Sequence, residues 1–107
     1  PFTIISKPCA HETQGISHDI DVPDYHPLSY GELKGLIAKA FNSSNSATRA
    51  RVQCRLVQAI EGHTCPHPID GPVAAKASEV NSTYVEGLRN RDSALTDRLA
   101  KILNIQP

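Results

Sequence analysis

Apolar side chains recur at helical spacing in several separate stretches of this chain. In residues 29–41 they fall on one face of a helix: Leu33, Leu36, Ile37, Ala40 and Phe41. Ser29 and Glu32 form a capping box, in which each side chain accepts a hydrogen bond from the other's backbone N–H. The pattern therefore predicts a first helix that begins after Ser29 and ends at the polar residues 42–45.

A second helix is predicted from about Ser46 to Ile60, because apolar residues again share one face: Val52, Leu56, Ala59 and Ile60. Gly62 is the expected stop. Two prolines, Pro66 and Pro68, make residues 63–70 a loop.

Three shorter helices are predicted after this loop. The third helix begins near residues 70–72 and runs to about Ser78, and the fourth runs from Ser82, a suitable N-cap, to about Arg89. Only residues 79–81 remain to form the turn between them. A fifth helix starts near Ser93, and its apolar side is Leu95, Leu99, Ile102 and Leu103.

The first 27 residues lack a helical period and are interrupted by Pro8, Gly15, Pro23 and Pro27. The sequence therefore predicts two parts, an irregular N-terminal arm over residues 1–27 and a helical domain over residues 28–107. The expected fold class is all-α, a compact bundle of about five short helices. No run of about 18 apolar residues is present, so we expect no membrane contact.

The third and fourth predicted helices have the spacing of a helix-turn-helix. Ala75, Val80, Val85 and Leu88 would form their shared buried face, with Val80 in the turn. The opposite side of the fourth helix would then be free to enter a DNA major groove. The same four residues also fit the core of another helical bundle, so spacing alone leaves both interpretations open.

Residues 73–105, VAAKASEVNSTYVEGLRNRDSALTDRLAKILNI, resemble the C-terminal part of a lambda-repressor-like (Cro and Xre type) DNA-binding domain. The closing LAKILNI, residues 99–105, is typical of the last helix of that family. Glu79 stands where the turn of the family usually has Gly. The resemblance implies a compact five-helix fold, binding as a dimer to paired half-sites, and base contacts from the start of the helix near Ser82.

Eight residues around this segment are predicted to contact DNA: Lys76, Asn81, Ser82, Thr83, Tyr84, Glu86, Arg89 and Arg91. The hydroxyls of Ser82 and Thr83 can bond to bases or phosphates, and Arg89 or Arg91 can reach a guanine edge or a phosphate. Lys76 suits a phosphate, and Glu86 can accept from a cytosine amine. Each of these side chains could equally belong to a solvated helix face.

The distribution of charge fits contact with phosphates although the net charge is zero. Residues 1–33 hold one Lys and five acids, a net of −4, whereas residues 34–107 hold ten Lys or Arg and six acids, a net of +4. We therefore expect a sequence-specific DNA-binding protein, a dimeric transcriptional regulator that inserts the helix starting near Ser82 into the major groove. Its expected location is the cytoplasm, or the nucleus if the source is eukaryotic.

A protein-interaction module on the same fold, such as an antitoxin, an inhibitor or an adaptor, is the alternative, with residues 1–41 as the partner face. An enzyme is not expected, because no nucleotide loop, paired-carboxylate motif or cofactor fingerprint occurs, and no cofactor is expected. A zinc site would draw on His63, Cys65 and His67 with Cys54, or with Cys9 and His11. The spacing is not the usual paired knuckle, so a surface loop without metal is predicted.

Overall fold

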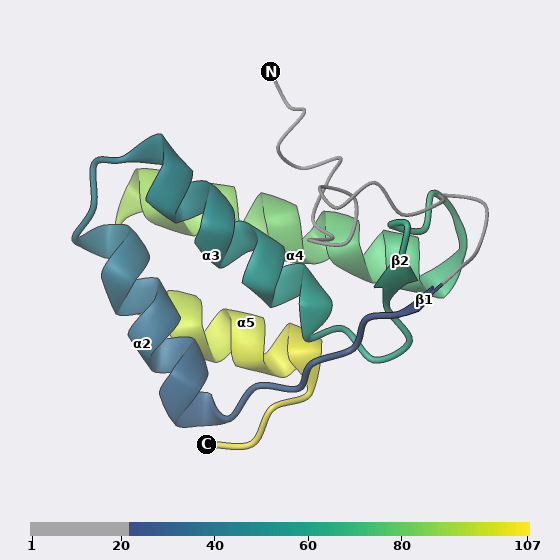
Figure 1. Ribbon diagram of the computed structural model, residues 1–107. Helices are drawn as coiled ribbons and strands as arrows, with labels where there is room; N and C mark the ends of the chain where they lie inside the picture. Colours follow the sequence, from purple (N-terminus) through teal and green to yellow (C-terminus); the bar gives the residue numbers. More distant parts are fainter. Residues whose placement is uncertain (1–21) are drawn as a thin grey trace.

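The computed structural model describes residues 22–107, and helices dominate this part of the chain (Figure 1). Its helices are α2 (Tyr30–Phe41), α3 (Ser46–Gln58), α4 (Gly71–Asn90) and α5 (Leu95–Leu103). Two residues, β1 (Val22–Pro23), pair antiparallel with β2 (Thr64–Cys65). The all-α class is confirmed. Of the predicted N-terminal arm, residues 1–21 lie outside the described residues, and residues 22–26 run beside residues 58–65 through backbone hydrogen bonds.

The predicted start of the first helix is confirmed. The Ser29 hydroxyl accepts from the Glu32 N–H at 3.1 Å, and the Glu32 carboxylate accepts from the Ser29 N–H at 2.8 Å. These hydrogen bonds with Ser29 lower the pKa of Glu32. The Asn45 side chain caps α3 in the same manner by accepting from the Ala47 N–H.

The hydrophobic core lies between the four helices and contains most of the predicted apolar residues. Leu33 and Ile37 of α2 are buried, as are Val52 and Leu56 of α3. From α5, the core receives Leu95, Leu99 and Leu103. Leu36, Phe41, Leu88 and Ile102 pack against this cluster from its edge. The faces predicted for these three helices are therefore confirmed.

The predicted break at residues 79–81 is wrong, because α4 is one continuous helix of 20 residues. The bundle accordingly has four helices in its described part and not about five. Residues 73–86 contain neither Gly nor Pro, so nothing in the local backbone chemistry forces a turn. The Ser82 hydroxyl donates back to the Glu79 carbonyl, a bond typical of a helix interior and not of an N-cap.

Continuity of α4 changes which of its residues reach the core. Positions five residues apart on one helix are separated by about 140° around its axis. Because Val80 is fully buried, the positions five residues before and after it turn away from the core. Ala75 is accordingly exposed, and Val85 is 43% exposed. The buried face is Ala77, Val80, Tyr84 and Gly87. The shared face expected for a helix-turn-helix is therefore not formed within residues 71–90.

Tyr84 connects α4 to α3 by a hydrogen bond inside the bundle. Its side chain is 2% exposed, and its hydroxyl donates to the Arg49 carbonyl at 2.8 Å. Burial raises the pKa of Tyr84 from 10.0 to about 12. The neutral phenol is thus the form that the folded protein holds.

Replacing Tyr84 with Phe is expected to remove a pH dependence at high pH. In the unfolded chain the phenol loses its proton near pH 10, whereas the folded protein keeps it to about pH 12, so the wild-type protein loses stability across this interval. Urea unfolding of both proteins between pH 9 and pH 12 measures the difference. At pH 7, Tyr84→Phe should cost about 1 kcal/mol for the lost hydrogen bond. Parallel stability curves above pH 10 would contradict the expectation.

Candidate functional site

The eight residues predicted to contact DNA are divided among different environments. Asn81 and Tyr84 are occupied inside the bundle, since the Asn81 amide oxygen accepts from the Gln53 amide at 3.0 Å and Tyr84 is buried. These two residues therefore leave the predicted DNA-binding set. In the continuous α4, Tyr84 belongs to the buried face of the helix.

The other six residues lie partly or fully at the surface, but they do not form one cluster. Thr83 and Glu86 line a depression of about 490 Å³, together with residues from the α4–α5 turn: Gly87, Asn90, Asp92 and Arg98. Lys76 lines a different depression, next to Glu61. Ser82, Arg89 and Arg91 are exposed. Lys76 is thus separated from Arg89 and Arg91, which lie at the C-terminal end of α4.

Five cations are carried by the last turn of α2, the first half of α3 and the C-terminal end of α4, which meet around the α2–α3 turn on the left in Figure 1. We call this region the basic end, and it consists of Lys39, Arg49, Arg51, Arg89 and Arg91. Residues 39–51 contain no Asp or Glu. Arg51 and Arg89 are exposed, and no hydrogen bond or ion pair within the described residues holds their guanidinium groups.

Direct contacts bring the three helices of the basic end together. The Arg91 guanidinium lies 5.3 Å from the centre of the Phe41 ring, a cation–π contact between the ends of α4 and α2. Arg49 Nε donates to the Ala40 carbonyl at 3.3 Å. Nearby, Arg98 and Asp92 form an ion pair at 2.9 Å. A guanidinium held over a partly buried ring keeps its charge and its outward donors, so the exposed Arg91 remains able to meet an anion.

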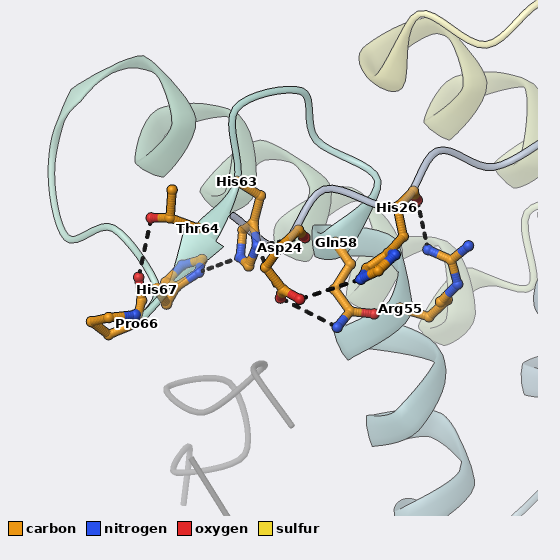
Figure 2. A network of polar contacts seen from close by, with 8 residues as sticks. All are labelled: Asp24, His26, Arg55, Gln58, His63, Thr64, Pro66 and His67. Carbon is orange, nitrogen blue, oxygen red and sulfur yellow. Dashed lines mark hydrogen bonds and ion pairs between the residues drawn. The ribbon is translucent and has the colours of Figure 1, made fainter. Parts of the chain in front are cut away.

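A network of polar contacts occupies the opposite end of the bundle, beside β1 and β2 (Figure 2). Asp24 is its centre, with 1% of its surface exposed. One carboxylate oxygen, Oδ2, accepts from the Gln58 amide at 3.3 Å and lies 3.4 Å from His63 Nδ1. The other, Oδ1, lies 3.4 Å from His26 Nε2 but makes no hydrogen bond. A buried carboxylate is therefore only partly satisfied.

The two histidines of the loop after α3 stand next to this carboxylate. His63 Nε2 and His67 Nδ1 are 3.1 Å apart, and their rings are inclined to one another by 46°. His63 is buried, which lowers its pKa, while the adjacent Asp24 partly opposes that effect. The backbone fixes this arrangement, because the Asp24 N–H donates to the His63 carbonyl at 3.1 Å.

The sequence did not predict the contact between Asp24 and His63. Of the residues in this network, it singled out only the two histidines of the loop. His63 and His67 were considered as ligands, but Asp24 was assigned to an arm without structure. The signal available in the sequence was weak, since it was only an acidic residue next to Pro23 in a short extended stretch. No group of three His, Cys, Asp or Glu side chains suited to a metal occurs within residues 22–107. Cys9 and His11 lie outside the described residues.

Cys54 is a half-buried thiol on α3, and burial raises its pKa. A thiol with a raised pKa is mostly protonated near neutral pH and is a poor nucleophile. Cys54 is therefore an unreactive thiol beside the core.

Comparison of the chain with protein-family models, with curated proteins and with solved structures found no match. None of the helices in residues 22–107 combines the length and the apolar character that crossing a bilayer requires.

Proposed function

We propose that this protein binds double-stranded DNA through the basic end, with contacts to phosphates supplying most of the affinity. The observation that carries the proposal is the contact of Arg91 with Phe41, which joins the end of α4 that carries Arg89 and Arg91 to residues 39–51, a stretch with three cations and no acid. Phosphate contacts from Lys and Arg dominate the affinity of proteins for DNA. The resemblance of residues 73–105 to a lambda-repressor-like domain supports the same ligand.

The proposed mode of DNA binding differs from the one predicted from the sequence. No separate recognition helix starts at Ser82, so α4 would approach the duplex with its C-terminal third and not with a helix N-terminus. Arg89 would point toward a groove or a phosphate, and Arg91 would hold the backbone beside the α2–α3 turn. Base reading by Ser82, Thr83 and Glu86 would be secondary to these charges.

Association of two copies is part of this proposal. Small, exposed residues follow one another along the outer face of α4, at positions Ala75, Ser78 and Ser82, and lead to the half-exposed Val85. Small side chains let a second helix approach closely, so this face suits contact with a second copy on paired half-sites, as in a dimeric transcriptional regulator. The same face would serve the alternative function, binding of a protein partner.

The expected result is salt-dependent DNA binding that depends on the basic end. Fluorescence anisotropy with a mixed-sequence duplex should give a plot of log K against log salt with a slope of about −4.5 if all five cations contact phosphates. The double variant Arg89→Ala/Arg91→Ala should make the slope shallower by about two and weaken binding at least tenfold. The matched control is Lys34→Ala/Lys101→Ala, which removes the same charge from exposed positions elsewhere.

Equal losses in the two double variants would mean that only net charge matters, and the assignment to the basic end would fail. Absence of binding at about 100 μM protein in low salt would overturn the DNA proposal itself. In that case the outer face of α4 would be tested for a protein partner.

A further inference from the structure

The loop after α3 places two imidazole nitrogens as two ligands of one metal ion would be placed. His63 Nε2 and His67 Nδ1 face each other at 3.1 Å (Figure 2). In a tetrahedral zinc site with bonds of 2.0–2.1 Å, two ligand nitrogens are about 3.3 Å apart. A separation a few tenths of an ångström wider would therefore admit an ion bound to both rings.

Asp24 fixes which nitrogen of His63 faces that position. His63 Nδ1 lies 3.4 Å from the Asp24 carboxylate and 3.4 Å from the Asp24 carbonyl, both of which are acceptors. Nδ1 is therefore the protonated nitrogen, and the Nε2 lone pair accepts a hydrogen bond from His67 Nδ1, which a metal ion bound to both rings would replace. A carboxylate behind a histidine is the usual arrangement around metal-bound imidazole, since it orients the ring and strengthens the ligand.

The buried charge of Asp24 supplies a second, independent reason. Its side chain is 1% exposed, and its Oδ1 has no hydrogen bond and only the exposed His26 Nε2 at 3.4 Å, so the carboxylate is only partly compensated. A cation bound to the far side of the His63 ring would place a positive charge close to this carboxylate without exposing it to water. The basic end, at the opposite end of the bundle, cannot supply this charge.

We propose that His63 Nε2 and His67 Nδ1 bind a divalent transition-metal ion of the zinc, nickel and copper class, with Asp24 as a positioning residue. Imidazole suits these ions, whereas magnesium and calcium require oxygen ligands. Residues 22–107 bring no third His, Cys, Asp or Glu side chain to the pair. From this part of the chain the two rings alone would bind the ion, and its further coordination positions would take other ligands such as water, as in sites that retain exchangeable ligands. This site is separate from the basic end and does not depend on the proposed function.

The test is a calorimetric titration of the whole chain with Zn²⁺ and, separately, with Mg²⁺. His67→Gln should weaken Zn²⁺ binding at least tenfold, because it removes one of the two nitrogens. The matched control is His26→Gln, which removes a histidine that lies against the same carboxylate but outside the pair. His26→Gln should change the Zn²⁺ affinity less than twofold, and Mg²⁺ should not bind at comparable concentrations. Circular dichroism checks that each variant is folded.

Nitrogen-15 NMR of the histidine rings tests the ligand atoms directly. Zn²⁺ should shift His63 Nε2 and His67 Nδ1 while Nδ1 of His63 keeps its proton. Asp24→Asn should weaken Zn²⁺ binding by about tenfold or more. It should also raise the fraction of His63 with its proton on Nε2, which a merely structural role of Asp24 would not do. Equal Zn²⁺ affinity in the wild type and His67→Gln, or shifts confined to other histidines, would overturn the proposal.

Discussion

Thr83→Pro is expected to destabilise this protein by about 3 kcal/mol or more. Thr83 is the thirteenth of the 20 residues of α4, so its N–H belongs to the interior of the helix. Proline would remove that donor, and its ring would meet the carbonyl four residues earlier. Urea unfolding followed by circular dichroism measures the loss. Thr83→Ala is the control, and it should change the free energy of unfolding by about 0.5 kcal/mol or less, because Ala favours the helix.

The same substitution separates the two architectures that residues 71–90 could adopt. In the helix-turn-helix predicted from the sequence, Ser82 is the N-cap and position 83 is the first residue of a helix, where proline is favoured. Thr83→Pro would then be tolerated. A variant as stable as the wild type would therefore contradict the continuous helix and restore the turn at residues 79–81.

Local chemistry made the first and last helices predictable. Ser29 and Glu32 satisfy each other's backbone donors, and this depends only on residues three apart in the sequence. Strong apolar spacing likewise predicted the buried faces of α3 and α5. In these helices the local preference and the tertiary packing agree, so the sequence alone was sufficient.

Residues 75–88 were assigned incorrectly because two apolar patterns overlap there. Ala75, Val80, Val85 and Leu88 fit a bent pair of helices, whereas Ala77, Val80, Tyr84 and Gly87 fit one straight helix. Ser82 was taken as an N-cap, but a serine can also bond to a carbonyl of the preceding turn, and it does. Glu79, in place of the usual Gly, was the signal against a turn, since a left-handed residue there would favour Gly.

The candidate sites depended on contacts between distant residues, which one sequence does not reveal. Asp24 and His63 are 39 positions apart, and the pairing of β1 with β2 together with the backbone hydrogen bond between residues 24 and 63 brings them together. The cation–π contact of Arg91 with Phe41 likewise joins two helix ends. Arg89 and Arg91 were among the eight predicted DNA contacts, whereas Lys39, Arg49 and Arg51 were not, and only the fold shows that α2, α3 and the end of α4 meet.

Gly87→Ala is expected to destabilise the protein, although alanine is the better helix former. Gly87 lies on the buried face of α4, and a Cβ added there would overlap Leu95 of α5, with its Cδ2 at 2.8 Å and its Cγ at 2.9 Å. Leu95 is fully buried in the core. Overpacking of this kind costs about 1–3 kcal/mol. The absence of a side chain at position 87 is what lets the two helices approach.

Gly35→Ala is the matched control, because Gly35 also lies inside a helix but has nothing within 4 Å of an added Cβ. This variant should gain about 0.5–1 kcal/mol from helix propensity alone. Urea unfolding of the two variants should therefore give changes of opposite sign, and their difference measures the overlap with Leu95. If the overlap is the cause, Gly87→Ala should cost less in a Leu95→Ala background, where the leucine is absent. An equal cost in both backgrounds would mean that Gly87 serves the backbone and not the packing of α4 against α5.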